Sequence, residues 1–187
     1  TLTVANANGT YAGVISSTGG GLTVTSGTQT LTGVDTYTGN TTINGTLALS
    51  GSGSILNSTN VIVNSILDIS NAANTSVTNL SASSNTSSIV LGSNTLTAQG
   101  AGTTTFAGNI SGTGGLTKAG SGTLTLSGTN AYSGATNINA GATLKLGATG
   151  AIPSSSAIVV DGTLDLAGYS SSFGSLAGAS TGLITSS

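Results

Sequence analysis

The sequence predicts an all-β protein whose short strands wind into a solenoid of about eight coils. Apolar residues alternate with Ser, Thr and Asn, which is the period of a strand with one buried face. Good helix formers are nearly absent, because the chain has two Lys or Arg residues and no Met, whereas 30 of its 187 residues are glycine. Finally, a unit of roughly 94 residues occurs twice along the chain.

The apolar residues recur in pairs two positions apart, and each pair indicates a short strand. Clusters of Gly, Asn and Ser separate the pairs and mark turns. We expect the inward residues of successive coils to stack into one continuous core. The residues predicted for this core are Leu22, Leu31, Leu47, Leu49, Leu67, Ile69, Leu116, Leu124, Leu126, Leu144, Leu146, Leu164 and Leu166.

The repeat is seen when residues 10–51 are set beside 105–147, and 60–70 beside 157–167. The sequence therefore predicts two units, 1–94 and 95–187, within one continuous β-helix. Strands spaced by about ten residues would also suit a sandwich or a barrel. Long tandem repeats, few aromatic residues and tight glycine turns favour the solenoid. Roughly 20–25 residues per coil then give a rod roughly 40 Å long.

The many glycines are predicted to form the corners of the coils. Every coil makes two or three tight turns, and glycine adopts the positive φ angles that such turns require. Glycine also permits neighbouring coils to approach closely. No glycine run matches a nucleotide-binding pattern, so we interpret these glycines as structural.

Composition excludes several classes of function. The chain has no Cys, His, Met or Trp, so a disulfide, a Ser-His-Asp triad and a thiolate or histidine metal site are all impossible. Two lysines and a net charge of −2 leave no basic patch for a nucleic-acid partner. No apolar run reaches about 18 residues, so we expect no membrane insertion of this segment. No signal peptide is visible, and we expect an internal piece or a chain whose signal was removed.

The four carboxylates are too dispersed for catalysis by a pair of acids. Asp68 and Asp165 are one repeat apart, about 20 Å along the rod, and Asp35 lies in another segment. Asp161 and Asp165 in DGTLD could share one face, where a weak calcium site is the alternative to a plain solvated strand. We predict that the chain is not an enzyme and binds no cofactor.

Tyrosine, threonine and lysine supply the remaining candidates for surface contacts. Tyr37 and Tyr132 recur at the same turn, where an exposed ring could contact a glycan and a buried ring would fill a corner of the coil. Thr-x-Thr triplets could bind ice, but they occur only intermittently. Lys118 and Lys145 are expected to solubilise or protect an apolar strand.

The segment GGLTKAGSGTLTLSGTNAYSGATNINAGATLKLG at 114–147 resembles the β-strand repeat associated with bacterial autotransporter passenger domains. The matching residues are Gly114, Gly115, Leu116, Thr117, Lys118, Gly120, Gly122, Leu124, Leu126, Gly128, Asn130, Tyr132 and Gly134. The first copy departs from the pattern at Val24, Gln29 and Asp35. The resemblance implies a right-handed parallel β-helix in a type V secreted protein of the bacterial surface, with roles in adhesion or aggregation and as a stalk that helps export. It implies no particular ligand.

The two ends of the chain have nearly the same repeat phase. Residues 182–187 read on into 1–6 resemble the internal join at 89–100, and neither end resembles a polar cap. We therefore expect the chain to associate with itself, head to tail or laterally, or with further repeats of the same chain. Cell-surface glycan or matrix is a further candidate partner. The predicted function is a structural and adhesive segment of an extracellular fibre, and the alternative is a glycan-binding module that uses Tyr37 and Tyr132.

Overall fold

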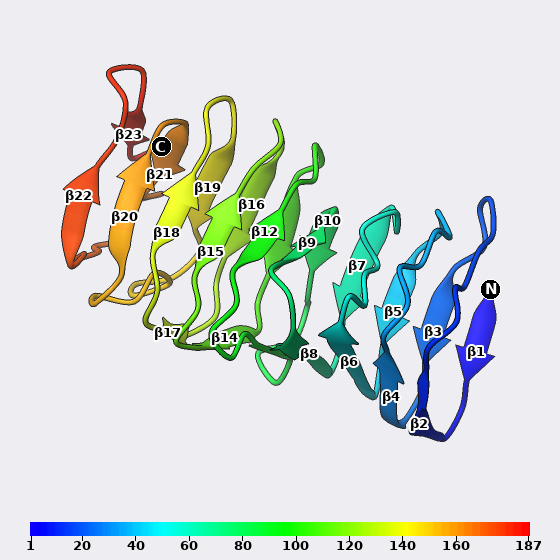
Figure 1. Cartoon of the computed structure of the whole chain (residues 1–187). Helices are drawn as coiled ribbons and strands as arrows, with labels where there is room; N and C mark the ends of the chain where they lie inside the picture. The colour runs from blue at the N-terminus through cyan, green and yellow to red at the C-terminus, as the bar shows by residue number, and fades with distance from the viewer.

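The computed structural model describes residues 1–187 as a parallel β-solenoid of about nine turns. It contains 23 strands and no helix, so no helix is present that could cross a membrane. The strands stack side by side from the N-terminal end to the C-terminal end (Figure 1). Each coil has three sides, which we call faces 1, 2 and 3 in the order in which the chain passes through them.

Face 1 runs the whole length of the solenoid. Two five-stranded sheets join there between β10 and β13, where the Ala82 N–H donates to Thr105 O at 3.0 Å and the Ala107 N–H donates to Ala82 O at 2.9 Å. Its strands are β1 (Leu2–Val4), β3 (Leu22–Val24), β5 (Thr41–Ile43), β7 (Asn60–Val63), β10 (Asn79–Ser81), β13 (Thr104–Phe106), β16 (Thr123–Leu126), β19 (Thr143–Leu146), β21 (Thr163–Asp165) and β23 (Leu183–Thr185). These ten strands define nine turns, one more than the sequence predicts.

Along the rod, face 2 changes from strand to loop and face 3 changes from loop to strand. Face 2 contains β2 (Ala7–Tyr11), β4 (Gly27–Leu31), β6 (Thr46–Gly51), β8 (Ile66–Ala72), β11 (Ser88–Val90), β14 (Asn109–Gly112) and β17 (Ala131–Tyr132), followed by loops 147–156 and 166–174. Face 3 begins as loops 12–21, 32–40 and 52–59. It continues as β9 (Thr75–Val77), β12 (Leu96–Ala98), β15 (Leu116–Lys118), β18 (Thr136–Ile138), β20 (Ala157–Val160) and β22 (Ser175–Ala177).

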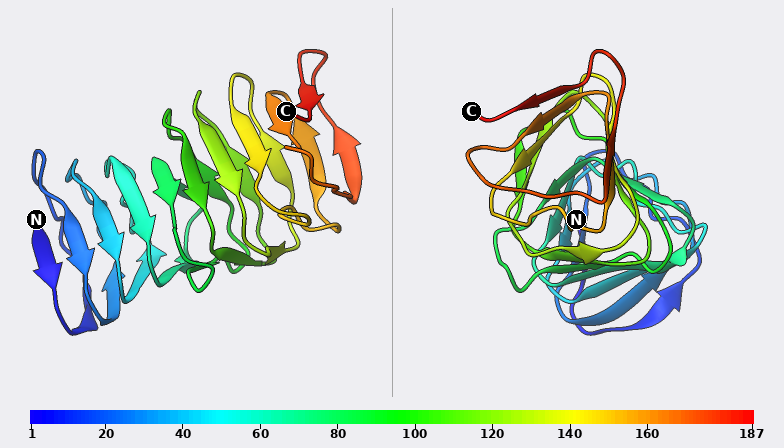
Figure 2. Two further views of the ribbon diagram at one scale, coloured as in Figure 1. Left: turned by 180° about the vertical axis from the view of Figure 1, so that it is seen from behind. Right: turned by 90° about the vertical axis from the view of Figure 1, so that its left-hand side faces the viewer.

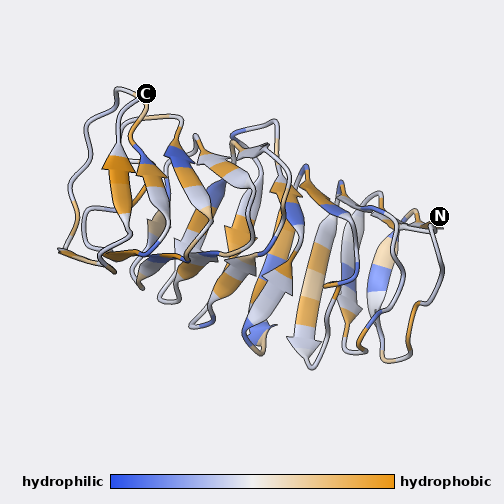
Figure 3. Ribbon diagram, turned by 90° about the horizontal axis from the view of Figure 1, so that it is seen from above, coloured by the Kyte–Doolittle hydropathy of each residue, from blue (hydrophilic) through white to orange (hydrophobic).

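The core is a set of aliphatic columns that run along the rod. On face 1, Leu124 pairs in register with Leu144, Leu144 with Leu164, and Leu164 with Ile184, each 20 residues further along the chain. All the residues predicted for the core are at most 1% exposed except Leu166, which is half-buried. Figure 3 shows the alternation of apolar and polar residues along the strands. The period-two pattern therefore corresponds to inward and outward side chains.

Glycine is required where one coil turns tightly against the next. Gly120 has a φ of +71°, and a Cβ at this residue would lie 1.9 Å from the Gln99 carbonyl oxygen. A Cβ at Gly128 would lie 1.8 Å from the Gly108 carbonyl oxygen. Any larger residue at either position would push two coils apart.

The two sequence repeats do not occupy the same faces. Leu22 lies on β3 of face 1, whereas its counterpart Leu116 lies on β15 of face 3. Most coils advance the register by 19 or 20 residues, but the coil from Ala82 to Phe106 takes 24. An offset of 94 residues is therefore not a whole number of coils. The second copy is turned by one face relative to the first, and the end view shows its coils offset from those of the first (Figure 2).

Candidate functional site

The turn tyrosines lie inside the solenoid, each at the head of a buried chain of hydroxyl groups. Tyr132 is 1% exposed, and its Oη lies 2.7 Å from Thr136 Oγ1. Thr136 Oγ1 lies 2.9 Å from Ser156 Oγ on the next coil, and Ser156 Oγ donates to Gly134 O at 2.9 Å. The chain of contacts thus joins two neighbouring coils across the core.

The first copy contains the same arrangement. Tyr37, also 1% exposed, has its Oη 2.5 Å from Thr41 Oγ1, which donates to Ser58 Oγ at 2.9 Å. Burial raises the pKa of Tyr37 and Tyr132 to about 12, so both phenols are neutral. Of the two alternatives for these rings, the structure supports the buried one, because neither Tyr37 nor Tyr132 reaches the surface and both fill corners of the coil.

Lys118 also points inward, contrary to the prediction that it solubilises a strand. It is 2% exposed, and its Nζ donates to Gly100 O at 3.1 Å, to Gly120 O at 2.9 Å and to Ala119 O. Burial lowers the pKa of this ammonium group. Lys118 follows Leu116 by two residues, and this spacing was the signal that it lies on the buried side of the strand.

Asp35 and Asn130 occupy matching positions in the two copies and make matching hydrogen bonds. The Ile15 N–H donates to Asp35 Oδ1 at 2.7 Å, and the Ile110 N–H donates to Asn130 Oδ1 at 2.8 Å. The sequence placed Asp35 at a position where the repeat has Asn, but it gave no indication that the side chain is buried. Burial raises the pKa of Asp35, and the Ile15 N–H partly offsets this rise.

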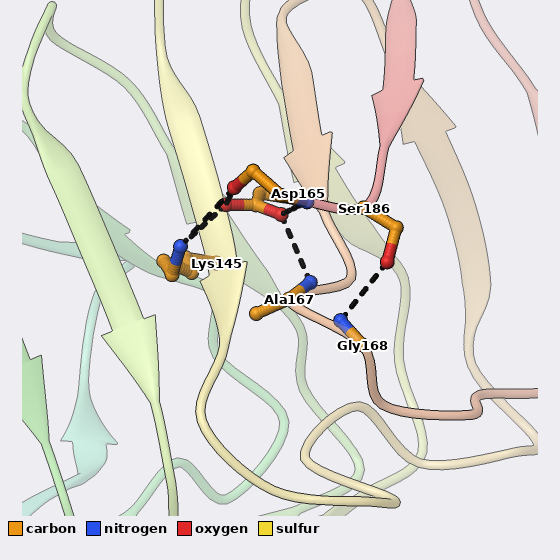
Figure 4. A network of polar contacts seen from close by, with 6 residues as sticks. Lys145, Asp165, Ala167, Gly168 and Ser186 are labelled. Atoms are coloured by element: carbon orange, nitrogen blue, oxygen red, sulfur yellow. Dashed lines mark hydrogen bonds and ion pairs between the residues drawn. The ribbon is translucent and has the colours of Figure 1, made fainter.

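Lys145 and Asp165 form an ion pair on the outer side of face 1 (Figure 4). Asp165 Oδ2 accepts from Lys145 Nζ at 2.6 Å and from Ser187 Oγ at 2.7 Å, and Oδ1 accepts from the backbone N–H groups of Ala167 and Ser187. Lys145 and these donors hold the pKa of Asp165 well below its usual range.

The acidic residues do not form a common site. Asp161 Oδ1 accepts the Ala179 N–H at 2.7 Å, whereas Asp165 is occupied by Lys145, so the calcium site considered for this pair is not formed. Asp68 lies on face 2 and accepts the Ser70 N–H at 2.9 Å. No group of three acidic side chains comes together anywhere in the chain.

Three concave surfaces interrupt the outline of the rod. A groove of about 530 Å³ lies beside loops 147–156 and 166–174, and ten residues line it, of which only Ile152 is apolar. The N-terminal coil has a hollow of about 460 Å³, lined mainly by apolar residues that include Leu2, Val14 and Leu31. A smaller hollow of about 180 Å³ lies at the other end, beside Leu176 and Ile184.

The outward threonines do not form a continuous array. Thr3, Thr23 and Thr42 align in register on face 1, and Ile62 ends the row. Further along the same face, Thr125 is followed by Lys145. The interruptions agree with the intermittent occurrence of Thr-x-Thr in the sequence.

The passenger-associated-transport-repeat family matches the chain at residues 26–49 and 116–146. These two segments are similar to that repeat. The two matches occupy equivalent parts of the two units, which confirms the resemblance to the autotransporter-associated repeat. No curated protein and no solved structure matches the chain.

The structure shows what the passenger-associated-transport-repeat does within the coil. The second match contains Lys118, Asn130 and Tyr132, and the first contains Asp35 and Tyr37. All five side chains are buried. Among them, Asp35, Asn130 and Lys118 make hydrogen bonds to a neighbouring coil.

Proposed function

We propose that the chain is a non-enzymatic structural segment of a surface-exposed passenger, located outside the bacterial cell. The passenger-associated-transport-repeat and the β-solenoid fold support this function. The observation that carries it is the burial of Lys118, Asn130 and Tyr132, because a repeat that directs its distinctive polar residues inward builds a scaffold. As a scaffold, the segment extends the protein by about 4.8 Å per coil.

Surface display tests this function. The chain would be placed between a signal peptide and an outer-membrane translocator, and its accessibility to external protease would be measured on intact cells. We expect display of the native chain and loss of display for Gly128→Val, which forces apart the coils that meet at Gly108. Gly9→Val is the control, because no atom lies within 4 Å of a Cβ there and its φ, like that of Gly128, is not positive. Equal display of all three chains would show that the solenoid contributes nothing to export.

We propose further that the segment associates with its own copies. Val14 and Val34 lie one coil apart on the flank of the first copy, and both are 53% exposed. Their counterparts in the second copy are Asn109 and Thr129, where Asn109 Oδ1 accepts the Thr129 N–H at 3.1 Å. The same backbone positions are thus polar in one copy and apolar in the other. A net charge of −2 produces little repulsion between neighbouring rods.

The end coils supply a second surface for the same association. Leu2 and Tyr11 are exposed at the first coil, and Leu176, Leu183 and Ile184 are exposed at the last. Strand β1 has a free edge on face 1, and so does β23 at the opposite end. Free strand edges with exposed apolar neighbours favour pairing with another strand. Head-to-tail contact of this kind does not close on itself and produces filaments.

Sedimentation velocity across a range of protein concentrations distinguishes the two modes of association. The double variant V14N/V34T gives the first copy the residues of the second, and we expect it to reduce lateral association with no change in the circular dichroism spectrum. Leu2→Asn with Ile184→Asn should instead shorten head-to-tail species. A monomeric native chain at all concentrations would overturn self-association and leave the scaffold function untouched.

A further inference from the structure

Asp35 and Asn130 occupy matching places in the two copies, two residues before the buried tyrosine. The side chains are 1% and 6% exposed, so both are removed from solvent. Each accepts a backbone N–H from the preceding coil, Asp35 from Ile15 and Asn130 from Ile110. On this side the carboxyl and amide groups make equivalent contacts.

The second polar atom of each side chain differs. Asn130 Nδ2 donates to Ala151 O of the following coil at 2.7 Å. Asp35 Oδ2 is buried and has no hydrogen-bond partner. The residue of the first copy that aligns with Ala151 is Ser54, whose carbonyl accepts the Asp35 N–H at 2.9 Å. An ionised carboxylate cannot donate to a carbonyl, whereas a protonated carboxyl can.

We propose that the Asp35 carboxyl joins the first three coils by hydrogen bonds when it is protonated, and that it holds them less tightly when it is ionised. In the protonated form, the Oδ2 hydroxyl donates to the following coil in the way that Asn130 Nδ2 does. Loss of that proton to solvent removes the donor and leaves a buried negative charge whose Oδ2 has no hydrogen-bond partner. The first copy is therefore held more tightly in acid, while the second copy is held by an amide that does not titrate.

Asp35 is the group in this part of the core whose charge we expect to change with pH. Tyr37 is the titratable neighbour, and it is neutral because burial raises its pKa to about 12, with the Asp35 charge adding to the rise. The amino terminus at Thr1 precedes face 1 of the first coil, whereas Asp35 lies on the face 3 loop of the second. The remaining charged residues all lie on later coils, namely Asp68, Lys118, Lys145, Asp161 and Asp165.

Burial raises the pKa of Asp35, and this direction fixes the sign of the effect. The contribution to stability is complete below the pKa of the unfolded chain, about 3.9, and it is lost as the pH rises through the higher folded pKa. Between the two values, the folding equilibrium constant falls by up to about tenfold per pH unit as the pH rises.

Urea unfolding of the native chain and two exchanged variants, between pH 3.5 and 8, tests the proposal. Asp35→Asn installs the amide of the second copy, and we expect a higher urea midpoint than that of the native chain at pH 7 and a difference between the two midpoints that shrinks as the pH falls. Asn130→Asp installs the carboxyl in the second copy, and we expect it to lower the midpoint at pH 7 and to steepen the pH dependence.

The native chain alone supplies an independent test in case Asn130→Asp fails to fold. Carbon-13 labelling of aspartate allows the Asp35 carboxyl to be titrated by NMR, with Asp35→Asn used to assign its signal. We expect Asp35 to titrate above the usual pKa of aspartate. Parallel pH profiles of the native chain and Asp35→Asn, or titration of Asp35 at or below the usual value, would overturn the proposal.

Discussion

Tyr132 Oη and Thr136 Oγ1 lie 2.7 Å apart in the core, and Thr136 Oγ1 makes a second hydrogen bond, with Ser156 Oγ on the next coil. Replacing Thr136 by Val removes the hydroxyl in the middle of this chain and leaves the Tyr132 phenol buried without its partner. We expect a loss of about 1–3 kcal/mol in the free energy of unfolding. Urea denaturation followed by circular dichroism measures this change. Thr143→Val on the outer side of β19 is the matched control, with an expected change within about 0.5 kcal/mol; equal effects of the two variants would contradict the role of the hydroxyl chain.

Lys118 offers a test of the buried ammonium group. Lys118→Val copies Val24 of the first repeat and leaves Gly100 O, Ala119 O and Gly120 O without this donor. We expect the free energy of unfolding to fall by about 1–3 kcal/mol, since buried carbonyls lose a charged partner. Lys145→Gln removes a charge from the Lys145–Asp165 pair, whose lysine side chain is 36% exposed, and the expected loss is about 0.2–1 kcal/mol. A Lys118→Val protein as stable as the native chain would show that its desolvation cancels its hydrogen bonds.

Gly120 and Gly150 separate the cost of a strained backbone from that of a steric clash. Both have φ angles near +70°, but only Gly120 would place a Cβ against a backbone oxygen, at 1.9 Å from Gln99 O. We expect Gly150→Ala to cost about 1 kcal/mol and Gly120→Ala several-fold more, with partial loss of the β signal in circular dichroism. Similar thermal midpoints for the two variants would mean that the positive φ angle accounts for the whole loss of stability and that the steric clash contributes nothing.

The ionised Asp165 carboxylate stabilises the fold, so we expect its contribution to be lost in acid, which is opposite in sign to the effect of Asp35. Its pKa is held low by Lys145, Ser187 and Ala167, so its contribution is present above the unfolded pKa of about 3.9 and is lost as the pH falls toward the folded value. We expect the protection factors of the β23 amides, which correct for the intrinsic pH dependence of exchange, to fall below about pH 4. In Asp165→Asn the same amides should have low protection factors at every pH. Protection factors in native β23 that are as high at pH 3 as at pH 7 would rule this out.

The rotation between the repeats predicts distances that differ for equivalent residues. Thr23 and Thr105 both point outward on face 1, four coil steps or about 19 Å apart, whereas Thr117, the repeat counterpart of Thr23, lies on face 3. The chain has no cysteine, so the pairs T23C/T105C and T23C/T117C can be spin-labelled specifically. We expect the longer distance for the second pair. A shorter T23C/T117C distance would place both repeats on one face.

Side-chain alternation was readable from the sequence because the period of a strand is a local property. Pairs such as Leu124 and Leu126 identify their strands, and the same rule applied to Lys118 would have placed it inside. The tyrosines were different, because a ring at a corner can face either inward or outward, and only the presence of Thr136 and Ser156 beside Tyr132 decides the outcome. Asp35 was visible as a departure from the repeat, but its orphaned oxygen appears only once the neighbouring coils are in place.

The all-β solenoid, its aliphatic core and its internal repeat follow from the sequence, because local periodicity and internal similarity reveal all three. Which polar residues are buried and how the two repeats are turned depend on the packing of the coils. Coil length is set by how many residues each corner takes up, and the 24 residues from Ala82 to Phe106 interrupt an otherwise regular advance of 19 or 20. Five coils carry the register from Leu22 to Leu124, whereas the sequence repeats after 94 residues, so Leu116 falls short of face 1 and lies on face 3.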